Sequence, residues 1–208
     1  MKPLTVGGSL EEDAAGLDLL IARVQACRRC PSMEGRRRVL SHANGPPDAR
    51  VMFIAEAPGR RGGEVTGVPL SRDASGLRFS RLLSLAGLSR GQVFITNAVL
   101  CNPRAASGVN RSPARVELQN CSDWLRAQIA LVNAEIIVTL GAVALAALDR
   151  IERHGLRLKA DAGRVVPWNG RLLVPLYHPS PRAGLSRSYA DQDEDFRRLG
   201  NLVAGLNQ

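Results

Sequence analysis

The strongest constraint on the fold is a repeated alternation between short apolar runs and longer amphipathic segments. The apolar runs are VMFIA, QVFITNAVL, EIIVTL and RLLVPLY, and each precedes a stretch with apolar residues at three- and four-residue spacing: SGLRFSRLLSLAGL, ARVELQNCSDWLRAQIALV, AVALAAL and DEDFRRLGNLVAGL. Such alternation is typical of strands joined by crossover helices. It predicts an α/β fold, a three-layer α/β/α sandwich with a central, mostly parallel, four-stranded sheet.

The length of the chain fits one substantial core. We expect its 208 residues to form a single domain, with an N-terminal helical segment at about residues 10–45 that carries the first cysteine pair, Cys27 and Cys30. The most apolar stretch, IIVTLGAVALAAL, is interrupted by Thr139 and Gly141 and indicates a strand that turns into a helix. It is too short to suggest a membrane span, so no membrane association is expected.

The loops after the strands are the expected place for a functional site, because open α/β sheets bind ligands beyond the carboxyl ends of their strands. In this chain those loops carry the sequences AEAPG, TNAVLCNP, LGA and YHPSP. Three side chains in them have chemistry to offer: Glu56, Asn97 and His178.

Each of these three side chains has a functional and an ordinary interpretation. Glu56 offers a carboxylate for catalysis, Asn97 an amide suited to the edge of a nucleobase, and His178 a donor for charge that develops on a leaving group. Alone, Glu56 could equally be a hydrogen-bond acceptor in a loop, Asn97 a turn cap and His178 a surface histidine. Their shared position at strand ends favours the functional interpretation.

The chain has four cysteines, grouped as a C-x-x-C pair at Cys27 and Cys30 with later single residues at Cys101 and Cys121. Disulfides are disfavoured, because MKPLTVGGSLEED carries no apolar signal segment and gives no reason to expect an oxidising compartment. A redox C-x-x-C would leave Cys101 and Cys121 unexplained. The spacing therefore indicates a four-thiolate metal site, and it fits zinc and an iron-sulfur cluster equally well.

The net charge of +9 arises mainly from arginine clusters such as RRC, GRRRVL and APGRRGG. This balance favours a polyanionic partner such as nucleic acid, although arginines scattered over a solvated surface would give the same total. With four Phe, two Trp and two Tyr, the chain is poorly equipped to bind single strands by aromatic stacking alone.

Taken in order, the motifs resemble those of the uracil-DNA glycosylase superfamily, in particular its iron-sulfur branches. AEAPG resembles the first motif, usually G-E-x-P-G, with Ala55 in place of glycine. VFITNAVLCNP resembles the T-N-x-V-x-C-x-P strand, IIVTLGAVA the internal I-V-x-L-G-x-x-A signature, and HPSP the closing H-P-S motif. The likeness runs from the first cysteine pair to HPSP and so covers most of the chain.

The resemblance implies a monofunctional uracil-DNA glycosylase that flips and excises uracil from DNA, and a structural [4Fe-4S] cluster on the four cysteines. It implies that uracil-containing DNA is the partner of a monomeric bacterial protein, cytoplasmic and associated with the nucleoid. The implied sites are Glu56 and His178 for catalysis; Asn97, Ala57, Gly59 and Leu70 for uracil; Pro179, Ser180, Pro181 and Arg182 for DNA; and Cys27, Cys30, Cys101 and Cys121 for the cluster.

Two departures from the family pattern are informative. The aromatic residue that normally follows G-x-P is replaced by Leu70, so either Leu70 covers the base or Phe53 or Phe79 stacks on it. The segment SGVNRSP lacks the basic insert of the branch that traps DNA covalently, so covalent capture is not expected. Leu70 also supports a second hypothesis, a non-catalytic, metal-stapled module that binds damaged or abasic DNA.

Overall fold

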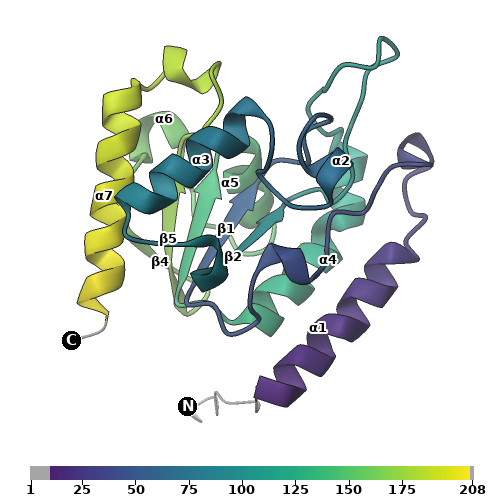
Figure 1. Ribbon diagram of the computed structural model, residues 1–208, viewed down its shortest axis with the longest axis horizontal. Coiled ribbons are helices and arrows are strands. Elements are labelled where there is room, and N and C mark those ends of the chain that lie inside the picture. Colours follow the sequence, from purple (N-terminus) through teal and green to yellow (C-terminus); the bar gives the residue numbers. More distant parts are fainter. Residues whose placement is uncertain (1–9, 207–208) are drawn as a thin grey trace.

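The computed structural model describes residues 10–206 of the chain (Figure 1). The helices are α1 (Leu10–Gln25), α2 (Gly63–Thr66), α3 (Ala74–Leu85), α4 (Arg115–Val132), α5 (Ala142–Asp149), α6 (Leu158–Asp161) and α7 (Tyr189–Gly205), and the strands are β1 (Val51–Ala55), β2 (Val93–Asn97), β3 (Ile136–Leu140), β4 (Val166–Trp168) and β5 (Arg171–Leu176). Single 3₁₀ turns lie at Pro31–Met33, His42–Asn44, Arg90–Gln92 and Ala183–Leu185. Within residues 10–206, no helix has both the length and the apolar character needed to cross a bilayer.

The strands form one sheet in the order β2-β1-β3-β5-β4. The four strands predicted from the sequence are present and pair in parallel, β1 with β2 and β3, and β3 with β5. The prediction of four strands was wrong by one, because β4 pairs antiparallel with β5 through a hairpin. Its turn residues, Asn169 and Gly170, both have positive φ angles, as an Asn-Gly hairpin turn requires, but β4 is only three residues long and contains Pro167.

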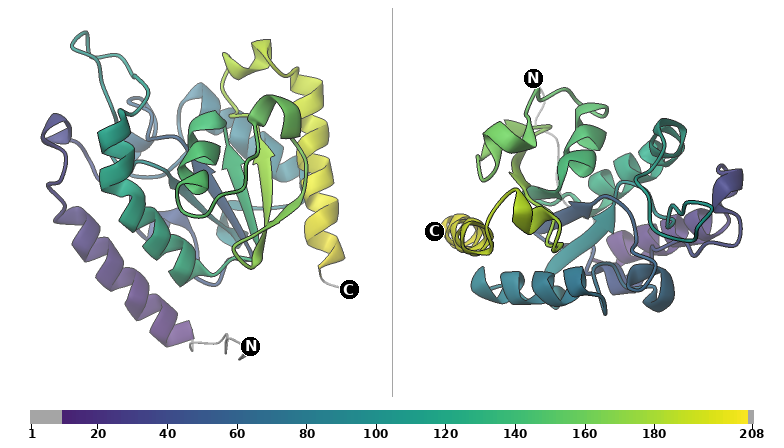
Figure 2. Two further views of the ribbon diagram at one scale, coloured as in Figure 1. Left: turned by 180° about the vertical axis from the view of Figure 1, so that it is seen from behind. Right: turned by 90° about the horizontal axis from the view of Figure 1, so that it is seen from above.

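Helices cover both faces of the sheet, which confirms the three-layer prediction (Figures 1 and 2). Alternate residues of each strand point to opposite faces. On β1, Met52 and Ile54 pack in the core shared with α1, α4 and α5, whereas Val51 and Phe53 pack in the core shared with α3 and α7. The sheet is therefore buried on both sides, as its almost uniformly apolar strands require.

The first cysteine pair lies just beyond α1 and not within a helix, which corrects the expected helical segment. Helix α1 ends at Gln25, and Cys27 and Cys30 follow in a turn. Pro31 keeps Cys30 extended, with φ −121° and ψ 100°, because a residue before proline is driven out of the helical region, so no helix can run through the cysteine pair. The guanidinium of Arg38 donates to the Cys27 carbonyl oxygen at 2.7 Å and so satisfies this acceptor in the turn that follows the helix.

The order of the strands places a crevice at one end of the sheet. From β1 the chain moves outward to β2, then crosses back to β3 on the other side of β1. The loops leaving β1 and β3 therefore diverge, which is the arrangement that opens a binding site at the carboxyl ends of parallel strands.

Candidate active site

A cleft of about 610 Å³ opens at the carboxyl ends of the strands. It brings together Glu56 after β1, Asn97 at the end of β2 and His178 after β5, although these residues are far apart in the sequence. Its lining is completed by Ala57, Pro58, Gly59, Gly63, Leu70, Asp73, Ser75, Asn102, Pro103, Asn110, Arg111, Ser180, Pro181 and Arg182. The predicted convergence of the strand-end loops is thus observed, and it includes all four residues expected at a uracil pocket.

Asn97 contributes an unpaired hydrogen-bond donor to the cleft. Its side chain is only 2% exposed, and Nδ2 has no partner in the part of the chain that the structure describes. The backbone around it is fixed, because Ala98 N donates to the Ala55 carbonyl at 2.8 Å and Val99 N to the Glu56 carbonyl at 3.1 Å. A buried amide without a partner costs stability unless a ligand satisfies it, so its position in the cleft points to a ligand acceptor.

His178 is held in a neutral form. Burial lowers its pKa to about 4, and the nearby negative charge of Asp73 opposes this shift only in part. Gly141, at the end of β3, faces the imidazole side chain: a Cβ built on it would lie 3.5 Å from His178 Cβ, and its φ of +100° suits only glycine. Near neutral pH the ring can therefore donate one hydrogen bond without carrying a charge.

Leu70 lines the cleft on a strained backbone. Its φ angle is +46°, a left-handed conformation that L residues other than Asn and Asp rarely adopt. The Arg90 guanidinium donates to the carbonyls of Pro69 and Leu70, and Thr66 Oγ1 pairs with Ser71 Oγ at 2.7 Å. Such strain persists only where the surroundings enforce it, and it concentrates at functional sites.

Phe53 and Phe79, the alternative stacking residues, lie elsewhere. Both are fully buried in the core between the sheet and α3 and α7, with ring centroids 5.2 Å apart, and neither lines the cleft. Phe53 packs in this core because both faces of β1 are covered by helices. Of the three candidates Leu70, Phe53 and Phe79, only Leu70 lines the cleft and could cover a base.

The DNA-binding segment predicted after His178 is only partly exposed. Pro181 and Arg182 are exposed and line the rim of the cleft with Ser180, and Leu185 in the following turn is 90% exposed. Pro179 is buried and does not line the cleft, so its expected contact with DNA stays a prediction. It lies directly after the half-buried His178, where the chain still packs against the sheet.

Sequence reasoning missed the residues that join the loops around the cleft. Asn102 is 1% exposed; its Nδ2 donates to the Pro58 carbonyl at 2.6 Å and to Asn110 Oδ1 at 3.0 Å. Asn110 Oδ1 also accepts from Arg60 N at 3.2 Å. Asp73 caps α3 by accepting from Gly76 N at 2.9 Å. Only this last contact had a sequence signal, an aspartate just before an amphipathic stretch.

The four cysteines gather beside the cleft. Cys121 is buried in α4, the other three pack against the same core, and all four are free thiols. Burial raises the pKa of Cys101 to about 11 and that of Cys121 to about 12; Cys27 and Cys30 are near enough to add to both shifts, and Cys101 adds to that of Cys121. Asn120 Nδ2 donates to Cys30 Sγ at 3.3 Å.

Among the described residues, no three Cys, His, Asp or Glu side chains are arranged to hold a metal ion. The four free thiols nevertheless pack against one core, and they supply the donors that either a zinc ion or an iron-sulfur cluster would take.

Glu117 ties the cysteine region to the cleft. This buried carboxylate accepts from Arg111 Nη2 at 2.6 Å, from Ser32 Oγ at 2.7 Å and from Ala114 N at 2.7 Å. These hydrogen bonds, that from Arg111 foremost, lower its pKa to about 2. Ser32 follows the first cysteine pair and Arg111 lines the cleft, so one side chain links both regions.

We therefore expect Glu117→Gln to lower the free energy of unfolding by about 3 kcal/mol, because it leaves the Arg111 charge without its partner. The pKa of Glu117 is lower in the folded state, so its stabilising effect is complete above about pH 4.5 and is lost as the pH falls towards 2. Urea unfolding of both proteins at several pH values measures this. Exposed Glu194, which pairs only with neighbours on α7, serves as the control: Glu194→Gln should change stability by less than about 0.5 kcal/mol. A Glu117→Gln difference that is constant down to pH 2 would contradict the assignment.

Comparison with known proteins gives a consistent picture. A family model described as the uracil DNA glycosylase superfamily matches residues 42–199. A type-4 uracil-DNA glycosylase of Thermotoga maritima is 32% identical over 165 residues, 79% of this chain and 81% of the relative. A type-4 enzyme of Saccharolobus solfataricus is 31% identical over 90% of this chain and 87% of its own length, and a type-5 enzyme of Thermus thermophilus is 30% identical over 78% and 86%.

Proposed function

Because this chain belongs to the uracil-DNA glycosylase superfamily, we propose that it excises uracil from DNA by hydrolysing the N-glycosidic bond, the first step of base excision repair. The observation that carries the proposal is the unpaired, buried amide of Asn97 in the same cleft as Glu56 and His178. A base stacked in a duplex cannot reach this cleft, so the deoxyuridine must flip out of the helix.

The Asn97 amide suits the edge of uracil. Nδ2 would donate to O4, and Oδ1 would accept from N3–H. Cytosine presents a donor at N4 and an acceptor at N3, so both contacts would become repulsive or unpaired. Leu70 would cover one face of the base, with Ala57 and Gly59 allowing close approach of the loop after β1.

His178 and Glu56 would act on the glycosidic bond. As the bond breaks, negative charge builds on the departing uracil, and a neutral His178 would donate a hydrogen bond to O2. The Glu56 carboxylate would stabilise the cationic sugar or orient the attacking water. No lysine lies among the motif residues to form a Schiff base, so the reaction would end at an abasic site, without strand cleavage.

The remaining parts of the proposal concern the surroundings of the site. Ser180, Pro181 and Arg182 would press on the DNA, with exposed Leu185 filling the space that the flipped base leaves. Cys27, Cys30, Cys101 and Cys121 would hold a [4Fe-4S] cluster that cross-links the segment after α1 to the loop after β2 and to α4. We further propose a monomer of one domain that acts in the bacterial cytoplasm on the nucleoid.

The Asn97 assignment predicts a change in base preference. Asn97→Ala should lower the single-turnover rate of uracil release by about 10–100-fold, the value of one good pair of base contacts. Asn97→Asp should lose the donor to O4 as well, but it can accept from cytosine N4–H. Release of uracil and cytosine from matched oligonucleotides measures both effects. Equal uracil rates for wild type and Asn97→Ala would show that the amide does not contact the base.

A further inference from the structure

Next to the cleft lies a basic groove, which we define by Arg60, Arg61 and Arg72. It consists of two adjoining hollows of about 350 and 530 Å³, which share Asp73 with the cleft. Ser75 and Asn110 also line both the cleft and the nearer hollow. The groove and the cleft are therefore continuous.

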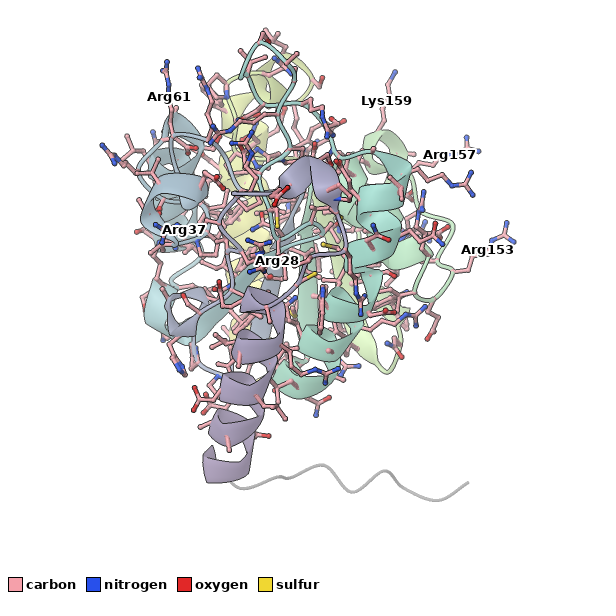
Figure 3. The ribbon with its side chains drawn as sticks, turned by 90° about the vertical axis from the view of Figure 1, so that its right-hand side faces the viewer. Arg28, Arg37, Arg61, Arg153, Arg157 and Lys159 are labelled. Carbon is pink, nitrogen blue, oxygen red and sulfur yellow. The ribbon has the colours of Figure 1, made fainter. Side chains whose placement is uncertain are left out.

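The arginines of the groove are free, unlike Arg111 inside the cleft. Within the described chain, none of the side chains of Arg60, Arg61 and Arg72 enters a hydrogen bond or ion pair, and Figure 3 shows Arg61 extending away from the ribbon into solvent. By contrast, cleft residue Arg111 is paired with Glu117 at 2.6 Å, and nearby Arg104 with Glu64 at 3.5 Å. Three unpaired guanidinium groups in one groove form a site for an anion with several charges.

The groove has a fixed shape. The glycines of the loop after β1 pack tightly on Asp73: a Cβ on Gly59 or Gly62 would lie only 2.7 or 2.6 Å from Asp73 Oδ2. Asn110 holds the same loop through Arg60 N, and Asp73 itself is held by the start of α3. These contacts hold the backbone of the loop that carries Arg60 and Arg61 in one place before any ligand binds.

Arg72 is coupled to the pocket residue Leu70. Only Ser71 separates them, and both have left-handed backbones, with φ angles of +66° and +46°. Leu70 lines the cleft while Arg72 lines the groove, so the strained segment of residues 70–72 supplies one side chain to each. A ligand that binds Arg72 would therefore fix the residue that covers the base.

We propose that the basic groove binds the sugar-phosphate backbone on one side of the flipped nucleotide, with Arg60, Arg61 and Arg72 contacting successive phosphates. This inference rests on the proposed function, since it takes the occupant of the cleft to be a nucleotide in DNA. Half-exposed Val65, which also lines the groove, would lie against the sugars. Backbone contacts of this kind position the strand without reading its sequence.

The first test is the salt dependence of binding to DNA that contains no uracil, measured by fluorescence anisotropy. In the triple variant Arg60→Ala, Arg61→Ala, Arg72→Ala, the slope of log K against log salt should become shallower by about 2–3, because three phosphate contacts are lost. The matched control is Arg153→Ala, Arg157→Ala, Lys159→Ala, which removes equal charge from exposed residues on another side of the molecule (Figure 3). Equal slopes for the two triple variants would overturn the proposal.

The second test locates the contacts along the DNA. Single neutral methylphosphonate linkages, walked through the positions on both sides of the uracil, should weaken binding of the wild type at a few linkages on one side. In the groove variant those same penalties should disappear. Penalties that persist in the variant would show that the DNA backbone binds elsewhere. Penalties that depend on the groove, without any release of uracil by the wild type, would refute the proposed function but would still support DNA binding in the groove.

A third measurement separates binding from folding. Because Arg72 has a left-handed backbone, Arg72→Gly should melt about 2–4 °C higher than Arg72→Ala, while both weaken DNA binding equally. If Arg72→Gly restored the affinity that Arg72→Ala loses, the loss would reflect the loop conformation and not the guanidinium, and Arg72 would not be a phosphate ligand.

Discussion

Replacing His178 by alanine is expected to slow the release of uracil by a factor of about 10²–10³ under single-turnover conditions, with a much smaller loss of DNA affinity. The reason is that the hydrogen bond to O2 is worth most when the departing base is an anion, whereas in the ground state that oxygen carries little charge. Rapid-quench measurement of uracil release, together with anisotropy for DNA binding, separates the two effects. Equal losses in rate and affinity would contradict a role in the transition state.

The pH dependence of the rate and of the stability gives a second test of the role of His178. Because burial holds the pKa of His178 at about 4, the wild-type rate should show no inflection from this residue near pH 6.5, the usual value for histidine. The same shift affects stability. The unfolded chain takes up a proton below about pH 6.5 and the folded chain only near pH 4, so stability decreases as the pH falls through this window. His178→Ala should remove that component of the pH dependence.

His42 provides the matched control. It is exposed, pairs with Asp18 at 2.8 Å and lies away from the cleft lining. His42→Ala should leave the rate of uracil release within about twofold of wild type. If it slowed release as much as His178→Ala, the effect would be a general one of losing a histidine.

Replacing Cys121 by serine is expected to have the largest effect on the fold. If the four cysteines hold the proposed [4Fe-4S] cluster, this variant should lose iron, sulfide and the visible absorbance of the cluster, because serine is a poor ligand for iron. Structural metal sites contribute on the order of 10 kcal/mol, which exceeds the stability of many domains, so we expect the segment joining α1 to the sheet to become sensitive to proteases. Iron and sulfide analysis and limited proteolysis measure this.

Ser122→Ala, in the next position of α4, is the control for this substitution. Its hydroxyl donates to the Gln119 carbonyl at 2.7 Å within the helix, and Ser122 is not one of the proposed ligands. It should retain full iron content. Normal iron content in Cys121→Ser would remove Cys121 from the ligand set, and one zinc per wild-type molecule would replace the cluster by a zinc site.

Most of the fold could be predicted from local sequence patterns, because the central strands are short apolar runs with helical segments between them. Strand β4 was not predicted, because its sequence signal was only an Asn-Gly turn beside a strand of three paired residues. The end of α1 was also misjudged: the helix ends at Gln25, and the effect of Pro31 on Cys30 prevents a helix from running through the cysteine pair.

The site was predictable where a motif ends a strand, and not where loops meet in space. Glu56, Asn97 and His178 lie on such motifs, and the structure places them in one cleft. Asn102 and Glu117 were missed because their importance comes from partners supplied by other loops, such as the Pro58 carbonyl and Ser32 Oγ. No periodicity or spacing reports a contact of this kind.

The central claim, that this protein breaks the glycosidic bond of deoxyuridine, is tested most directly by mass spectrometry of a duplex oligonucleotide with one uracil after incubation with the purified protein. The account predicts free uracil and an intact strand that has exchanged the base for a hydroxyl group, with no change in a control duplex that carries thymine at that position. Tight, salt-sensitive binding with the uracil strand unchanged in mass would contradict it and would identify the protein as a DNA-binding module without catalytic activity.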